Sequence, residues 1–343
     1  MGPTGDSYRG LQIHPTRQCN LRCRHCYSAS APEERDQLSV ALLCAAIDDA
    51  RAQGYTIANV SGGEPLLYTS LRALLAHARQ RGMLTTVTSN GMLLDERRLE
   101  TLHGVVDVLA ISLDGVPASH NTMRGSERAF ETMLSRLDGV RRSGIPFGFI
   151  FTLTQHNLHE LAWATEFAIE QGARLLQIHP LETAGRAATL LPDAHPDELE
   201  FAYAYLEVAR IRKLVGERLF IQLDLADREL LRRHPERAFA DQGAAERVDA
   251  PLAELVSPLI IEADASVVPI GYAFARAYAL GNLHQARLRD LAAAWRRERY
   301  PAFHRLCRRV FDEATSGDRL PFINWYERLA QGAEREQLQP QPS

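Results

Sequence analysis

One short stretch decides the fold of this chain: Cys19-Asn20-Leu21-Arg22-Cys23-Arg24-His25-Cys26. The cysteines follow the spacing C-x3-C-x2-C, so their three thiolates lie in one loop and can converge on one centre. Three thiolates are one too few for a closed structural zinc site or a fully ligated iron–sulfur cluster. A four-iron cluster that is held by only three cysteines leaves one iron open to bind another molecule.

Two other interpretations of these cysteines fit less well. A zinc site would need a fourth Cys or His at finger-like spacing, but His25 lies inside the motif and His14 has no characteristic spacing. A secreted disulfide framework is disfavoured because the chain has 5 cysteines, an odd number, and three of them are crowded together. The pattern therefore favours an iron–sulfur cluster.

Further motifs follow, each directly after a segment that is typical of a buried strand. They are Ser61-Gly62-Gly63-Glu64-Pro65, Ser89-Asn90-Gly91, and Ile111-Ser112-Leu113-Asp114-Gly115 with His120, Arg124 and Gly125 behind it. Paired glycines at a strand end let the backbone approach a ligand closely. Each motif alone would be an ordinary turn, but their order and spacing after the cysteines argue against chance.

Together the motifs resemble those of the radical S-adenosylmethionine (radical SAM) superfamily. The resemblance implies a [4Fe–4S] cluster ligated by Cys19, Cys23 and Cys26, whose open iron chelates the amino and carboxylate groups of SAM. It implies an oxidoreductase-like, metal-binding enzyme in which an external donor of the flavodoxin or ferredoxin type reduces the cluster. Cleavage of SAM then gives a 5′-deoxyadenosyl radical, which abstracts a hydrogen atom from the substrate.

The resemblance also implies which residues contact SAM. In the superfamily the Gly-Gly-Glu-Pro motif pairs with the amino group, and the serine of the Ser-Leu-Asp-Gly run reaches the ribose. The following arginine meets the carboxylate, to which its planar fork can donate two parallel hydrogen bonds. The residue before the third cysteine contacts adenine, mainly through its backbone. Carried over to this chain, the cofactor-binding residues are His25, Gly62, Gly63, Glu64, Asn90, Ser112 and Arg124.

Strand and helix signals alternate from residue 12 to residue 214. The expected strands are 12–14, 56–60, 84–88, 105–113, 147–153 and 174–179, and the expected helices are 39–53, 71–81, 96–103, 130–143, 158–171 and 198–214. Alternating βα units predict an α/β fold with a parallel sheet and right-handed crossovers. They fit the incomplete (βα)6 TIM-like barrel of the radical SAM family, in which loops at the carboxyl ends of the strands carry the site.

The remaining part of the chain resembles a small α+β SPASM/Twitch-like domain, with a hairpin around Asp264, an Ala279-Leu280-Gly281-Asn282-Leu283 run and a helix at 288–299. Such domains hold auxiliary clusters through cysteines, but this region has only Cys307, and Pro269-Ile270 stands where the family usually has Pro-Cys. We expect a barrel over 1–215, a cluster-free SPASM/Twitch-like domain over 216–335 that covers the barrel mouth, and a disordered tail over 336–343.

Four residues are candidates for substrate contact or proton transfer: His179, Glu182, Tyr272 and Tyr278. His179 and Glu182 follow the sixth strand, and the two tyrosines follow the hairpin. A structural, hydrogen-bonded role is at least as well supported for the histidine, and packing is the default for the two tyrosines. Cys44, on the first helix, is expected to be a buried apolar residue rather than a ligand.

Charge and hydropathy argue against nucleic acid and a membrane as partners of this protein. The net charge of −4 gives no basic field for nucleic acid, and no apolar run approaches the ~20 residues that a membrane span needs. The start of the chain lacks a signal-peptide core, so we expect a cytoplasmic protein with reduced thiols.

The sequence leaves three functions open. The first is a natural-product enzyme that modifies a ribosomally synthesised peptide by a cross-link, thioether or epimerisation. The second is a radical SAM enzyme that dehydrogenates, decarboxylates or epimerises a small molecule such as a sugar or nucleoside. The third is a non-catalytic iron–sulfur or SAM-binding protein, which the intact cysteines and motifs disfavour. Substrate identity is not readable from one sequence.

Overall fold

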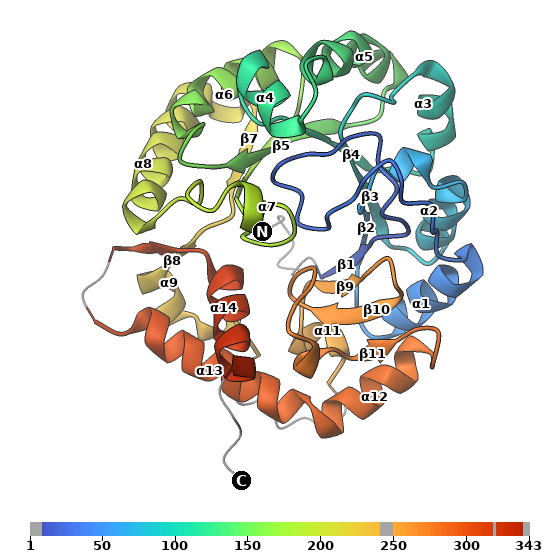
Figure 1. Cartoon of the computed structure of the whole chain (residues 1–343), viewed down its shortest axis with the longest axis vertical. Helices are drawn as coiled ribbons and strands as arrows, with labels where there is room; N and C mark the ends of the chain where they lie inside the picture. Colours follow the sequence, from blue (N-terminus) through green and yellow to red (C-terminus); the bar gives the residue numbers. More distant parts are fainter. Residues whose placement is uncertain (1–8, 241–249, 318–319, 339–343) are drawn as a thin grey trace.

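The computed structural model of the chain describes residues 9–240, 250–317 and 320–338. A 10-stranded sheet in the order β11-β10-β9-β1-β2-β3-β4-β5-β6-β7 forms the centre, and helices surround its outer face (Figure 1). The strands are β1 Gly10–Ile13, β2 Ile57–Val60, β3 Leu84–Ser89, β4 Val108–Ser112, β5 Phe147–Leu153, β6 Leu175–Pro180, β7 Phe220–Leu223, β9 Leu259–Ile261, β10 Ser266–Pro269 and β11 Gly281–Asn282. A second sheet pairs β8 Ala226–Asp227 with β12 Phe322–Ile323.

The strands from β1 to β7 are parallel to their neighbours, as in a βα barrel. In the described part of the chain the end strands β7 and β11 do not pair with each other, so the barrel stays open. This confirms the predicted α/β fold with an incomplete barrel. Strand β7 was not predicted. It belongs to the barrel sheet although it follows residue 215, where the sequence predicted the end of the barrel domain. The division into domains stays a prediction.

Residues alternate along the strands between a fully buried outer face and a partly exposed inner face. The outer face is apolar and packs against the helices, as Val60, Val87 and Leu109 show with at most 1% exposure. The inner face is more polar and mostly only partly buried; its polar side chains include Gln12, Asn59, Thr86, Thr88, Thr152, Gln177 and His179. The alternation thus leaves a polar lumen inside an apolar shell.

Of the helices α1 to α8, all but the short α7 form the outer arc of Figure 1, and α7 lies in the middle of the view. They are α1 Val40–Ala52, α2 Leu71–Gln80, α3 Glu96–Leu102, α4 Pro117–Arg124, α5 Ala129–Ser143, α6 Leu161–Glu170, α7 Ala187–Leu190 and α8 Glu198–Val215. Six of them match predicted helices within a few residues, whereas α4 and the short α7 were not predicted. Among the described residues, no helix has the length and apolar character to cross a membrane.

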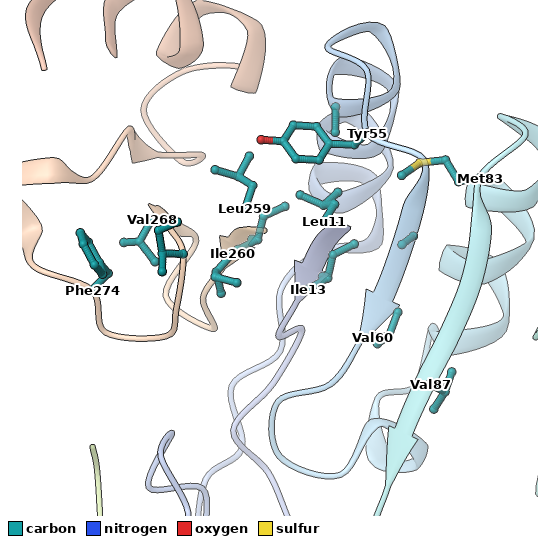
Figure 2. Packing of buried hydrophobic residues seen from close by; sticks show 14 of the residues in the cluster. Leu11, Ile13, Tyr55, Val60, Met83, Val87, Leu259, Ile260, Val268 and Phe274 are labelled. Atoms are coloured by element: carbon teal, nitrogen blue, oxygen red, sulfur yellow. The ribbon is translucent and has the colours of Figure 1, made fainter. Parts of the chain in front are cut away.

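The hairpin β9–β10 is hydrogen-bonded to the barrel. β9 runs parallel to β1, with Leu11 opposite Leu259 and Ile13 opposite Ile261. Their side chains pack in one core beside Val60 and Val87 (Figure 2). The hairpin therefore extends the sheet beside β1, although the sequence predicted that this region covers the mouth.

The C-terminal helices pack around this extension. They are α9 Arg228–Arg233, α11 Leu252–Leu255, α12 Leu288–Glu298, α13 Tyr300–Thr315 and α14 Trp325–Leu338. Cys307 lies on α13 with 2% exposure, in the apolar core. Because α14 ends at Leu338, residues 336–338 are helical and the predicted disordered tail is wrong for them; residues 339–343 lie outside the described part.

The turn after β10 contains unusual backbone. Ile270 has φ 72° and Ala273 has φ 59°, a left-handed conformation that is rare for a β-branched residue. Glu262, with 2% exposure, accepts a hydrogen bond from the Ala273 amide at 2.5 Å and pairs with Arg276. These contacts hold the turn that carries Tyr272.

Candidate active site at the mouth of the barrel

The cysteine motif lies in a long loop that leaves the carboxyl end of β1. Cys19 and Cys23 are 8% and 7% exposed, and they form a small cluster with Leu21, against which Cys26 and Met92 pack. In Figure 1 this loop crosses the mouth of the barrel. The structure thus brings the three cysteines of the motif together at the end of the barrel where strands finish.

The paired glycines after β2 support this loop through their backbone. The Gly63 amide donates to the Thr16 carbonyl at 2.9 Å, and the Glu64 amide donates to the Gln18 carbonyl at 2.8 Å. A Cβ atom on Gly62 would lie 2.7 Å from the Thr16 carbonyl oxygen, so only glycine fits. The sequence predicted that the backbone of the paired glycines approaches a ligand closely. In the structure this backbone packs closely against the loop before Cys19.

Glu64 is fully buried and hydrogen-bonded within the protein. Its carboxylate accepts from the Leu66 amide at 3.2 Å, the Ser89 hydroxyl at 2.9 Å and the Asn90 amide at 2.9 Å. Burial raises the pKa of Glu64, and these donors oppose the shift. Its side chain therefore ties the end of β3 to the turn after β2, rather than pointing to a ligand.

Asn90 reaches the cysteine loop from the end of β3. Its Nδ2 donates to Asn20 Oδ1 at 2.8 Å and lies 4.0 Å from Cys19 Sγ. Ser112, at the end of β4, is 9% exposed. It follows the outward-facing Leu109 and Ile111 by an odd number of residues, so its side chain is on the lumen face.

Arg124 lies at the end of α4, behind Cys23. Its Nε is 2.6 Å from Asp114 Oδ2, and its Nη1 donates to Cys23 Sγ at 3.7 Å. Burial alone would raise the pKa of Asp114, but the Arg124 cation and two nearby histidines keep it below its usual range. The predicted partner of the SAM carboxylate is thus already paired with a buried aspartate.

His25 packs against the same ion pair. Its Nε2 lies 3.9 Å from Asp114 Oδ1, and its side chain is 11% exposed. Burial lowers the pKa of His25 to about 4. The imidazole therefore contacts the protein, which leaves the backbone of His25 for the predicted adenine contact.

The residues around the cysteines fit an iron–sulfur cluster. Burial, with the Glu64 carboxylate nearby, raises the pKa of Cys19 to about 12, and burial also raises that of Cys23, so iron must displace protons from these thiols. Among the described residues, no three Cys, His, Asp or Glu side chains converge tightly enough for one metal ion. A four-iron cluster binds each cysteine through a different iron and needs a wider spacing.

A second ionic group lies at the ends of β6 and β7. His179 Nδ1 is 3.1 Å from Asp224 Oδ2, and its Nε2 is 3.0 Å from Glu182 Oε1. Burial opposes the charge on His179, but the hydrogen bonds that its ring donates to Asp224 and Glu182 raise its pKa to about 10. The structure brings the two predicted residues together and adds Asp224, which sequence reasoning missed.

The two candidate tyrosines have different surroundings. Tyr272 stacks on His14 with ring centroids 4.9 Å apart and lies 5.6 Å from Tyr27, the residue after Cys26. Tyr278 is 5% exposed and packs against Phe303, and its hydroxyl donates to Glu336 on α14. Tyr272 is therefore next to the cysteine loop, whereas Tyr278 belongs to the C-terminal helical core.

Residues 13–168 match the family model of the Radical SAM superfamily. The Fe-coproporphyrin III synthase of Methanosarcina barkeri is 30% identical over 234 residues, which are 65% of this chain and 59% of that protein. The PqqA peptide cyclase of Ruegeria pomeroyi is 30% identical over 205 residues, 57% of this chain and 54% of the relative. The chain thus matches little more than half the length of these relatives.

Solved structures extend the likeness to the whole described fold. The structure titled native anSMEcpe with bound AdoMet superposes with a TM-score of 0.63 and 16% identity, and the match covers 95% of this chain and 96% of the other. At this identity the likeness concerns the fold alone. It includes the C-terminal region that the family match leaves out.

Proposed function

Because residues 13–168 match the radical SAM superfamily, we propose that this chain is an enzyme of that superfamily, which reductively cleaves SAM at a [4Fe–4S] cluster and takes a hydrogen atom from a peptide. One observation carries the proposal: Cys19 and Cys23 are buried together at the carboxyl end of the barrel strands, and Cys26 packs against them. When bound, the cluster and SAM would supply the 5′-deoxyadenosyl radical. The proposed location is the cytoplasm, where thiols stay reduced.

The proposed ligands of the cluster are Cys19, Cys23 and Cys26. Ser112 and Asn90 are the side chains that we assign to SAM, because one faces the lumen and the other lies beside Cys19. His25, Gly62 and Gly63 would contact SAM through their backbone. Glu64 and Arg124 would act from behind, by holding the loop that carries the cysteines.

A ribosomally synthesised peptide is the favoured substrate. The PqqA peptide cyclase supports this choice, as does the C-terminal region that resembles a SPASM/Twitch domain without its cluster. Charge at the mouth supports it too, since the partly exposed group of Asp224, His179 and Glu182 carries two carboxylates and one imidazolium. Such a group would attract an amine or a peptide amide rather than a polycarboxylate.

A small molecule is the second candidate. The relative from Methanosarcina barkeri is named for Fe-coproporphyrin III, a tetrapyrrole that carries several carboxylates. A sugar or nucleoside, which is neutral or weakly charged, would meet the acidic group at the mouth with less repulsion. Redox-neutral chemistry on either would need no auxiliary cluster.

Anaerobic reconstitution tests the cluster. We expect iron and sulfide near four each per chain, and 5′-deoxyadenosine on addition of dithionite and SAM. Cys23→Ala should abolish both, whereas Cys307→Ala should keep the full iron content because Cys307 is buried in α13. A content near eight irons, or a full cluster that never yields 5′-deoxyadenosine, would contradict the proposal.

A second experiment separates the substrate classes. An extract of the source cells should stimulate 5′-deoxyadenosine formation, and the extract is divided into protease-treated and untreated halves. Loss of stimulation after protease treatment supports a peptide. Stimulation that survives the protease would favour the small molecule.

A further inference from the structure

The loop between β6 and α8, residues 181–197, contacts the cysteine loop through Arg186. The Arg186 guanidinium donates from Nε to the Cys23 carbonyl and from Nη2 to the Ser30 carbonyl, both at 2.8 Å. Its backbone amide donates to the Cys26 carbonyl at 3.0 Å. Arg186 thus hydrogen-bonds to the backbone at both ends of the segment from Cys23 to Cys26, and also at Ser30.

The neighbouring Gly185 makes this contact possible. Gly185 has φ 58°, and a Cβ atom built on it would overlap the carbonyl groups of Cys26 and Tyr27. The two loops therefore meet backbone to backbone. In Figure 1, α7 lies next to the cysteine loop in the middle of the mouth.

Arg186 differs from Arg124 in how its charge is balanced. Arg124 is paired with Asp114 at 2.6 Å, so its charge is neutralised beside Cys23. In the part of the chain that the structure describes, the guanidinium of Arg186 contacts only carbonyl oxygens and no carboxylate pairs with it. Its side chain is partly buried, so water screens it less than an exposed arginine.

We propose that Arg186 is a positioning residue for the cluster: it clamps the loop that holds Cys23 and Cys26, and its unbalanced charge favours the reduced cluster. The inference rests on the proposed function only in requiring the cluster, not in the identity of the substrate. Reduction adds one electron, supplied by a low-potential one-electron carrier, and makes the cluster more negative. A fixed cation nearby stabilises that state more than the oxidised one, because charge and hydrogen bonds around a cluster set its potential.

The test uses the full-length reconstituted protein without SAM or substrate. Redox titration followed by electron paramagnetic resonance gives the midpoint potential, and iron release to a chelator gives the stability of the cluster. Three variants are compared with the wild type: Arg186→Gln removes charge and clamp, Arg186→Lys keeps the charge without the planar fork, and Arg24→Gln removes an exposed charge from the same loop.

Arg186→Gln should shift the midpoint potential to a more negative value and release iron on the order of 10-fold faster. Arg186→Lys should keep a potential near that of the wild type while it releases iron faster, and Arg24→Gln should change neither. Equal potentials in the wild type and Arg186→Gln would overturn the assignment. If Arg186→Gln cannot be loaded, recovery of the cluster in Arg186→Lys supports the proposal and failure to recover overturns it. A wild-type protein without a four-iron cluster would instead refute the proposed function.

Discussion

Two ionic groups stand at the same end of the barrel but in opposite environments. Asp114 and Arg124, behind the cysteine loop, have side chains that are 0% and 9% exposed. His179 and Glu182, with Asp224 at the other side of the mouth, are 34%, 38% and 18% exposed. The charges of the first group are paired with each other inside the protein, whereas the second group is exposed enough to contact another molecule. Charged residues at strand ends can therefore either stabilise the structure of a site or contact its substrate, and their burial decides between these two roles.

Removal of the Asp114 charge should have the largest effect, because it leaves Arg124 charged and unpaired in a buried site. Asp114→Asn should lower the free energy of unfolding by about 3–5 kcal/mol. Chemical denaturation of the metal-free protein measures the change. Asp138→Asn is the matched control, since Asp138 forms an ion pair with Arg141 on the surface and should change stability little. If both variants lowered the free energy of unfolding by the same amount, the proposed difference between buried and exposed ionic groups would be wrong.

The charge on His179 should give the open group a measurable pH dependence. Its pKa is raised to about 10 in the folded chain, against about 6.5 in an unfolded one. The stabilisation is therefore fully present below about pH 6.5 and is lost as the pH rises to about 10. Because the group is partly exposed, we expect on the order of 1–2 kcal/mol. Unfolding followed from pH 6 to pH 10 should show a smaller fall in stability for His179→Asn than for the wild type; parallel curves would argue against a charged His179.

The smallest effect on stability is expected at Glu182. Glu182→Gln keeps the size of an exposed side chain, so the free energy of unfolding should change by less than about 1 kcal/mol. Substrate-stimulated formation of 5′-deoxyadenosine should fall on the order of 10-fold or more, if the carboxylate orients substrate or moves a proton. Formation without substrate should stay the same, because Glu182 is not among the proposed SAM contacts. Unchanged stimulated rates would remove Glu182 from the substrate site.

The sequence predicted what depends on local pattern. Strand β5 and helices such as α5 match the predicted spans, because apolar residues mark both and Gly144 follows α5. The cysteines and the motif residues were found because their order along the chain is characteristic. We expected His179 and Glu182 to lie close together because both are at the carboxyl end of the sixth predicted strand.

What the sequence did not predict depends on contacts between distant segments. Asp224 was missed because β7 is short and partly exposed, and its weak alternation gives little strand signal. Arg186 binds a carbonyl 163 residues earlier, and no local pattern marks such a contact. The contacts that Glu64 and Arg124 make inside the protein were missed for the same reason, since packing sets those partners, and their roles toward SAM stay predictions. Gly185, followed by an arginine after a strand, was the one local signal that could have drawn notice.

The pairing of β1 with β9 has a consequence for how the protein is made. The Gly10 amide donates to the Ser257 hydroxyl, a residue 247 positions further along the chain, and β9 completes the edge of β1 just beside it. Contacts of such separation close late in folding, because the entropy of a long loop is lost before they form. On the ribosome, the strand that leads into the cysteine loop is synthesised early but gains its second neighbour only after residue 261 has emerged. We therefore expect a nascent chain stalled before β9 to hold β1, and with it the start of the cysteine loop, less firmly than the finished protein does.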